Sequence, residues 1–415
     1  MIEPARLAAA RWFRSKQRRI ASVAEVERAP LPPAELVIVE VAFADGGAAE
    51  RYLVPQVNGR EPEDGDGAWA ALVEAIGAGS VVGGNRGRFV AERTPAFDRL
   101  VSTPPTERAL RVEQSNTSVV VGGSLILKVY RLLEAGENPD LEVSAYLTDA
   151  GFADTPAVAG HVRYVPDVGE PGAAAMLQAF VPSTGDAWAA MLATLAADPE
   201  RATAVAARIG ALTARLHAAL ASRPDRHDFP ARPATTAETA GWRAAAEDEL
   251  ARAIASVSGT DHDRLIQLAP AVRARFADAF GRAAGAETVT RIHGDYHLGQ
   301  LLAHEDGAFS VIDFEGEPAR PMAERRLPAS PLRDVAGMLR SFDYAARVSQ
   351  RDTGVDADAW LPHGRAAFTD AYGRGGPLVE AFELEKACYE VHYEASNRPG
   401  WLWLPLGAIE RIVTG

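Results

Sequence analysis

Residues 291–317, RIHGDYHLGQLLAHEDGAFSVIDFEGE, are the part of this chain that decides its fold and its chemistry. Asp295 of a His-Gly-Asp turn precedes Asp313 of an Ile-Asp-Phe-Glu sequence by eighteen residues, with a short hairpin-like segment between them. Phosphoryl transfer from a nucleotide needs one carboxylate that takes the proton of the acceptor hydroxyl and another that holds Mg²⁺. Asp295 fits the first role and Asp313 fits the second. The spacing therefore predicts a phosphoryl-transfer site.

A third residue of this stretch fits the same chemistry. Gln300 follows Asp295 by five residues, where protein kinases place the Asn that helps to bind metal. The alternative is a pair of surface turns that happen to contain Asp, Gly and His. The complete spaced set favours the functional interpretation over that alternative.

The composition fits a globular protein with more than one lobe. The 415 residues exceed one ordinary core, and 47% apolar and 24% charged residues are typical of soluble domains. A formal net charge of −13 argues against nucleic acid or an anionic membrane as the main partner. The single cysteine excludes an intrachain disulfide, and we see no signal peptide or membrane-spanning run. We expect a cytoplasmic protein; its oligomeric state stays open, with a monomer as one option.

The first hundred residues read as a small α+β unit. Apolar spacing predicts a helix over 5–20 with a basic, solvated face, and a second helix over 66–77. Residues 35–44 and 50–57 alternate apolar and polar positions around an Asp-Gly-Gly turn, which predicts a β-hairpin.

A second pattern begins near residue 111. Lys128 lies inside the apolar strand LILKVY, where a buried ammonium is costly unless it meets an anion. Glu142 lies fourteen residues later and opens a predicted helix. A strand Lys, a helix Glu and a small polar run before the hairpin are the parts that hold nucleotide phosphates in a kinase-like lobe. The polar run contributes Ser115, Asn116 and Thr117.

Residues 174–180 form a short apolar strand that leads into Val-Pro-Ser, a suitable hinge between two lobes. Backbone groups around Gln178 and Phe180 are our candidates for binding the adenine edge of ATP.

These motifs together resemble the aminoglycoside phosphotransferase-like branch of the protein-kinase superfamily. The blocks HGDYHLGQLL and DFEGEPARPMAERRLPASPLRDVAGMLRSFDYAA, with the early ARWFRSKQRR, narrow the resemblance to the actinobacterial maltokinases and the glucosamine kinases close to them. The resemblance implies an α+β, bilobal protein-kinase-like fold with an additional N-terminal α+β cap subdomain. The cap would cover residues 1–100, the N-lobe 101–182 and the mostly helical C-lobe 183–415.

The resemblance also implies roles for single residues. Asp295 would be the catalytic base, and Lys128 with Glu142 would position the phosphates. Mg²⁺ would be held by Asp313, Gln300 and Glu315, since amide and carboxylate oxygens suit a hard cation. His293 would order the catalytic turn, and Asp334, after the Ser-Pro helix start at residue 330, would brace it from inside.

The acceptor pocket is expected near residues 389–405, YEVHYEASNRPGWLWLP. Together with Asp295 and His297 of the catalytic turn, we expect Glu390, Glu394 and Trp401 to contact a small-molecule sugar. An extended Trp401–Trp403 repeat would point both rings the same way. The alternative is that the tryptophans are core and the glutamates are solvated.

The paired glutamates favour an ammonium-bearing sugar, because charge-assisted hydrogen bonds are the stronger ones. The pair of tryptophans and the paired glutamates also look closer to the glucosamine kinases than to the maltokinases, and this resemblance implies ATP-dependent phosphorylation of D-glucosamine to glucosamine 6-phosphate. The alternatives are conversion of maltose to maltose 1-phosphate, an aminoglycoside phosphotransferase, and a nucleotide-binding pseudokinase.

Overall fold

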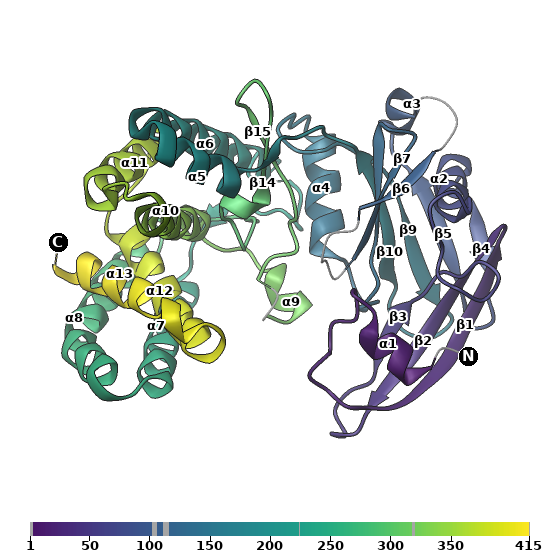
Figure 1. Cartoon of the computed structure of the whole chain (residues 1–415), viewed down its shortest axis with the longest axis horizontal. Helices are drawn as coiled ribbons and strands as arrows, with labels where there is room; N and C mark the ends of the chain where they lie inside the picture. The colour runs from purple at the N-terminus through teal and green to yellow at the C-terminus, as the bar shows by residue number, and fades with distance from the viewer. Residues whose placement is uncertain (1–2, 102–105, 111–115, 224, 318–319, 415) are drawn as a thin grey trace. The chain divides into compact units, whose positions relative to one another are not determined.

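The computed structural model describes residues 3–101, 106–110, 116–223, 225–317 and 320–414. They form two compact units, Met1–Pro182 with Pro321–Ala323, and Ser183–Arg320 with Glu324–Gly415. Both units appear in Figure 1, and each is described here by itself. Unit 1 is a sheet-rich body, whereas unit 2 is mostly helical.

Unit 1 begins with a three-stranded antiparallel sheet in the order β1-β2-β3. The predicted hairpin is present, because β2 (Ala34–Phe43) pairs with β3 (Glu50–Leu53), and β1 (Ile20–Leu31) adds a long strand that the sequence analysis did not predict. The predicted helix over 5–20 is wrong beyond α1 (Pro4–Ala9). Trp12 and Phe13 bury their rings against Tyr52 from an irregular segment, so their apolar spacing reflects contact with the sheet rather than a helix.

A second, seven-stranded sheet follows in the order β4-β5-β9-β10-β8-β7-β6. Strands β8 and β10 carry the predicted nucleotide-binding residues Lys128 and Gln178. The core beside the sheet is mainly aliphatic, with Val119, Leu127 and Leu177 fully buried. The strands are β4 (Val81–Gly83), β5 (Gly87–Arg93), β6 (Glu107–Ala109), β7 (Thr117–Val121), β8 (Leu125–Val129), β9 (Val158–Pro166) and β10 (Gly172–Ala179). The helices of this unit are α2 (Ala68–Ala78), α3 (Phe97–Leu100) and α4 (Pro139–Asp149).

Unit 2 consists mainly of packed helices, with the small sheets β11-β14-β15 and β12-β13 (Figure 1). Its helices are α5 (Ala187–Ala197), α6 (Pro199–Leu220), α7 (Thr236–Ser256), α8 (Gly259–Ala283), α10 (Leu332–Thr353), α11 (Ala357–Tyr372), α12 (Pro377–Asn397) and α13 (Trp403–Thr414), with short turns η1 (Leu298–Gln300) and η2 (Pro399–Trp401). Its strands are β11 (Gly185–Asp186), β12 (Arg232–Pro233), β13 (Thr288–Val289), β14 (Leu301–Ala303) and β15 (Phe309–Val311). The remaining helix is α9 (Met322–Arg325).

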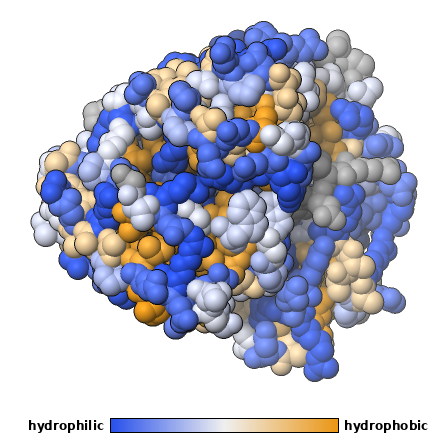
Figure 2. Space-filling view, turned by 60° about the vertical axis from the view of Figure 1, so that its left-hand side comes forward, coloured by the Kyte–Doolittle hydropathy of each residue, from blue (hydrophilic) through white to orange (hydrophobic). Residues whose placement is uncertain are grey.

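The face of the protein that Figure 2 shows is largely hydrophilic. On the face that Figure 2 shows, blue residues cover most of the area and apolar residues form smaller areas between them. Within the described ranges, no helix combines the length and the apolar character that crossing a membrane requires.

Candidate active site

The β14–β15 hairpin of unit 2 brings the predicted catalytic segments together. Leu301 pairs with Val311 in antiparallel register, so η1 before β14 and the residues after β15 lie at the same end of the hairpin. There the amide of Ile312 donates to the carbonyl of Gln300 at 3.0 Å. Asp313 therefore follows directly on a backbone contact with Gln300, its predicted partner in metal binding.

Asp334 of α10 braces the catalytic turn, as the sequence analysis predicted. Its carboxylate, which is 1% exposed, accepts from the amides of His293 (2.8 Å) and Gly294 (2.9 Å) and from Nε2 of His217 (3.0 Å). Burial alone would raise the pKa of Asp334, but the hydrogen bond and charge of His217 and the bond from Gly294 lower it. The carboxylate stays ionised and fixes the backbone immediately before Asp295.

His293 joins the two aspartate-bearing segments. Its Nε2 lies 3.0 Å from the carbonyl oxygen of Ile312, which only accepts, so Nε2 carries the proton. Its Nδ1 accepts, with a long contact of 3.4 Å, from the amide of Asp295. The predicted ordering role of His293 is thereby confirmed, since one ring contacts the residue before Asp313 and the amide of Asp295.

The backbone conformation of both segments is unusual. Asp313 has φ +67°, in the left-handed region that non-glycine residues seldom adopt. Gly294 has φ +85°, and a Cβ at this position would lie 3.2 Å from Cα of Gly316. The His-Gly-Asp turn and the segment after Asp313 are thus in close backbone contact, and strain of this kind occurs preferentially at functional sites.

His297 lies close to both aspartates. Its Nδ1 accepts from the amide of Gly299 at 3.0 Å, so Nε2 is the protonated nitrogen of the neutral ring. Burial lowers the pKa of His297, although the charges of Asp295 and Asp313 act in the opposite direction. The neutral ring presents an N–H donor among the carboxylates, which fits the prediction that His297 takes part in acceptor binding.

Lys386 of α12 is a site residue that the sequence analysis missed. Its Nζ lies 3.8 Å from Oδ1 of Asp295 and 3.3 Å from Oε1 of Glu317. Glu317 in turn accepts from Nε of Arg320 at 2.9 Å. The signal was available, because Lys386 precedes Tyr389 by three residues and Glu390 by four, which places it on the same helix face.

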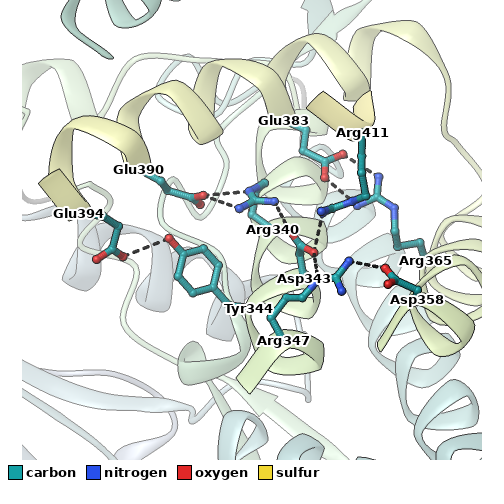
Figure 3. Close-up of polar contacts among 10 residues, drawn as sticks. All are labelled: Arg340, Asp343, Tyr344, Arg347, Asp358, Arg365, Glu383, Glu390, Glu394 and Arg411. Atoms are coloured by element: carbon teal, nitrogen blue, oxygen red, sulfur yellow. Dashed lines mark hydrogen bonds and ion pairs between the residues drawn. The ribbon is translucent and has the colours of Figure 1, made fainter. Parts of the chain in front are cut away.

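Glu390 is held by the buried Arg340 of α10, as Figure 3 shows. Nε and one Nη of Arg340 donate at 2.9 and 2.7 Å, both to Oε2 of Glu390. Within the described part of the chain, Oε1 of Glu390 has no hydrogen-bond partner. Arg340 and Lys386 favour the charged carboxylate, but burial outweighs them and raises the pKa of Glu390. One oxygen therefore remains to accept from a ligand.

Arg340 also belongs to a larger buried ion-pair network (Figure 3). Its other Nη donates to Asp343 at 2.5 Å, and Arg411 of α13 lies 2.6 Å from the second oxygen of Asp343. Arg365 of α11 makes a two-point contact with Glu383 of α12. The network therefore connects α10 and α13 and pairs α11 with α12 beneath Glu390.

Glu394 does not take the role predicted for it. It is 1% exposed, and its two oxygens accept from Arg398 at 2.6 and 2.9 Å and from the hydroxyl of Tyr344 at 3.1 Å. Both oxygens are already used inside the protein, which contradicts the prediction that Glu394 binds the sugar. One turn of helix separates it from Glu390, but its side chain turns inward.

The tryptophans also differ from the prediction. Pro399 starts the η2 turn and Trp403 begins α13, so the segment is helical and the two rings do not follow an extended repeat. The guanidinium groups of Arg351 and Arg398 lie 4.8 and 5.3 Å from the centre of the Trp401 ring. These contacts pack Trp401 against two guanidinium groups, and its predicted contact with the sugar stays a prediction.

In unit 1, Lys128 has a carboxylate partner that the sequence analysis did not single out. Its Nζ donates to Oδ2 of Asp140 at 2.8 Å, and the hydroxyl of Tyr130 donates to the same oxygen at 3.0 Å. The helix begins at Pro139, with Asn138 as its N-cap, earlier than the sequence analysis placed it. Asp140 therefore faces the sheet and is 1% exposed, while Glu142 lies further along the first turn. Asp140 is thus a carboxylate partner of Lys128, and the pairing of Lys128 with Glu142 stays a prediction.

The other predicted nucleotide contacts receive mixed support. Ser115 lies outside the described residues, and Asn116 precedes β7. The Thr117 hydroxyl accepts from Nε of buried Arg131 at 2.7 Å, and its predicted contact with a phosphate stays a prediction.

The segment predicted to contact adenine also makes backbone hydrogen bonds within the protein. Gln178 pairs with Ile126 in the sheet, and the amide of Phe180 donates to the carbonyl of Ser124 at 2.7 Å. The Phe180 amide is therefore already hydrogen-bonded within the protein, and the contact of this segment with the adenine edge stays a prediction.

Cys388 lies on the buried side of α12, between Lys386 and Glu390. The thiol is fully buried, and burial together with neighbouring carboxylates raises its pKa. A buried, protonated thiol is chemically inert, so we assign Cys388 no catalytic role.

With this geometry, comparisons with known proteins define the class. The sequence profile of the Phosphotransferase enzyme family matches residues 106–368, and that of the Maltokinase N-terminal cap domain matches residues 7–84. The chain belongs to the phosphotransferase enzyme family and has the bilobal, protein-kinase-like fold with an N-terminal cap that the sequence predicted.

Two relatives of the chain are glucosamine kinases. The chain is 32% identical to the glucosamine kinase of Streptacidiphilus jiangxiensis over 389 residues, 86% of this chain and 84% of the relative. It is 28% identical to that of Mycolicibacterium smegmatis over 91% of this chain and 98% of the relative. A solved glucosamine kinase in complex with glucosamine, ADP and inorganic phosphate matches with a TM-score of 0.77 and 26% identity, covering 99% of each chain.

Proposed function

We propose that this protein is an ATP-dependent sugar kinase that transfers phosphate to the 6-hydroxyl of D-glucosamine. The observation that carries the proposal is the fixed turn around Asp295, whose carboxylate is 25% exposed. The carboxylate of Glu390 on α12 is ion-paired with Arg340. The glucosamine kinase relatives support the choice of acceptor.

In this proposal Asp295 accepts the proton of the attacking hydroxyl. Phosphoryl transfer demands little covalent chemistry from the protein, so orientation of the hydroxyl and electrostatic stabilisation dominate. His293 and Asp334 hold the turn, and the Nε2–H of His297 donates to an oxygen at the reacting centre. In unit 1, Lys128 positions nucleotide phosphates while Asp140 keeps it in place.

We further propose that Asp313, Glu315 and Gln300 hold Mg²⁺. Carboxylate oxygens of Asp313 and Glu315 lie within 4.8 Å of one another, and the turn carrying Gln300 contacts the residue before Asp313. An all-oxygen donor set fits this hard cation. When bound, the ion would neutralise charge on the transferring phosphoryl group.

Asp313→Ala tests the metal assignment. Removing a carboxylate ligand should weaken Mg·ATP binding by roughly tenfold or more, while Mg²⁺-free nucleotide should bind almost as in the wild type. Isothermal titration with and without Mg²⁺ measures both constants. Equal affinity of the variant and the wild type for Mg·ATP would contradict the role of Asp313.

The amino group of the acceptor is assigned to Glu390. Its free Oε1 can accept a hydrogen bond from an ammonium, and such charge-assisted bonds are about twice as strong as neutral ones. Arg340 neutralises part of the carboxylate charge through Oε2 alone, so it orients Glu390 without blocking Oε1.

Glu390→Gln tests the acceptor. Because Gln can still accept from Arg340 but carries no charge, KM for glucosamine should rise about tenfold or more, while KM for glucose changes little. Steady-state assays of ATP consumption with both sugars measure the ratio. Glu380→Gln is the matched control, because it breaks an exposed α12 pair with Arg275.

The same assay separates the alternatives. Equal effects of Glu390→Gln on the two sugars would remove the ammonium argument, and faster turnover of maltose than of glucosamine would favour a maltokinase. Turnover with an aminoglycoside alone would favour the third alternative. ATP binding without turnover of any acceptor would favour a pseudokinase.

A further inference from the structure

The ammonium group of Lys386 lies between acidic side chains from different segments of unit 2. Its ammonium contacts Asp295 on the catalytic turn (3.8 Å) and Glu317 on the segment after Asp313 (3.3 Å). The ring of Tyr389, one turn further along α12, lies 4.8 Å away. A single side chain thus connects the catalytic turn, the segment that follows Asp313 and the helix that carries Glu390.

The surroundings keep this ammonium charged. Burial disfavours the charged form, but Glu317, Asp295 and Glu390 outweigh it and raise the pKa of Lys386. Since Glu317 is also bound by Arg320, the acidic cluster has fixed partners on two sides. A permanent cation therefore lies next to Oδ1 of the proposed catalytic base.

We propose that Lys386 is a positioning and specificity-determining residue: it holds Oδ1 of Asp295 so that Oδ2 faces the acceptor hydroxyl, and it excludes acceptors whose ammonium lies beside the reacting hydroxyl. The proposal rests on the function proposed above. Among the described residues Oδ2 of Asp295 has no partner, so engagement of Oδ1 alone defines the orientation of the carboxylate.

The spacing on α12 gives the second half of the proposal. Lys386 and Glu390 are four residues apart, about 6 Å along the helix axis. The cation lies at the Asp295 end and the free carboxylate oxygen lies one turn away. An acceptor that reacts at Asp295 must therefore place its ammonium at the Glu390 end. Glucosamine satisfies this when its 6-hydroxyl reacts, because the 2-amino group is on the opposite side of the ring.

The test uses the full-length protein with Lys386→Met, Lys386→Arg and, as the matched control on the same helix, Glu380→Gln. We expect Lys386→Met to lower kcat for glucosamine by roughly 10²-fold, because a misplaced catalytic group costs about that much. KM for ATP should stay within about twofold of the wild type. Lys386→Arg should recover most of kcat because it restores the charge, and Glu380→Gln should match the wild type.

A second experiment tests acceptor specificity by comparing glucosamine with 4-amino-4-deoxyglucose. The amine of the second sugar is on C4, next to the ring carbon that bears the hydroxymethyl group. The wild type should use the 4-amino sugar poorly, and Lys386→Met should narrow the gap between the two sugars about tenfold by removing the repulsion. Both sugars carry one amine, so their overall charge is the same.

The outcomes separate the two proposals. Wild-type protein that is inactive on glucosamine but active on another sugar would defeat the proposed acceptor, and the Lys386 effect on kcat would then be measured on that sugar. Unchanged kcat in Lys386→Met, or a rise in sugar KM at constant kcat, would overturn the positioning role. If Lys386→Met melts far below the wild type, the Lys386→Arg variant tests the positioning role instead. A stably folded Lys386→Arg variant that does not recover kcat would also overturn that role.

Discussion

Asp295→Asn should abolish phosphate transfer while leaving nucleotide binding intact. Asn keeps the size and the hydrogen-bonding capacity of the side chain but cannot take a proton, so kcat should fall by about 10²–10⁴-fold, the usual contribution of a general base. The backbone of the turn should not move, because His293 and Asp334 hold it through main-chain atoms. Rapid-quench measurement of phosphorylated sugar, with the ATP affinity from titration, gives both values.

The expected result depends on Asp295 acting on the acceptor alone. Asp306→Asn is a suitable control, because Asp306 lies in the exposed loop between β14 and β15 and its carboxylate accepts only from the amide of Ala308. Turnover of Asp295→Asn near the wild-type rate would rule out the base. Loss of ATP affinity in the same variant would instead give Asp295 a role in metal or phosphate binding.

Arg340→Met should be the most destabilising single change in the ion-pair network. Arg340 is 2% exposed, and its loss leaves Glu390 and part of Asp343 as buried charges without their partner. Removing one partner of a buried ion pair usually costs about 3–5 kcal/mol. Chemical denaturation of the variant and the wild type, monitored by tryptophan fluorescence, measures the difference.

Two further variants make this prediction specific. Arg243→Met removes an exposed pair with Glu247 on α7 and should hardly move the denaturation midpoint. The double variant Arg340→Met/Glu390→Gln should recover part of the lost stability, because the second change removes one of the two stranded charges. A single variant as stable as the wild type would show that Met fills the site without penalty.

The catalytic half of the site was predictable because its signal is local. The turn around Asp295 and the segment around Asp313 are joined by a hairpin of fixed length, so their spacing in the sequence determines their proximity. The roles of His293 and Asp334 were implied by the family resemblance, with Asp334 expected in the first turn of a helix after Ser330.

The acceptor half was less predictable because it depends on which helix faces are buried. Helical spacing placed Glu390 and Glu394 on one face, but only the packing of α12 on α10 decides that Glu390 keeps a free oxygen while Glu394 turns to Tyr344. Asp140 was not singled out as a partner of Lys128 for a related reason. The helix begins at Pro139, earlier than expected, and this start brings Asp140 to face the sheet.

The N-terminal segment shows the same limitation. Leu7, Trp12 and Phe13 are all buried against the first sheet, and their spacing imitates a helix. A loop that lies across a sheet can bury residues at any interval, so periodicity alone does not distinguish it from a helix.

The sole thiol of the chain, at residue 388, can report the local detachment of the helix that carries it. A sulfhydryl reagent can modify it only in molecules whose twelfth helix has transiently detached, so the labelling rate follows the free energy of that local event. Sugar that engages the helix should slow the labelling, whereas an analogue that misses it should not. No probe has to be engineered into the chain, and the signal comes from a position two residues from the group that selects the substrate.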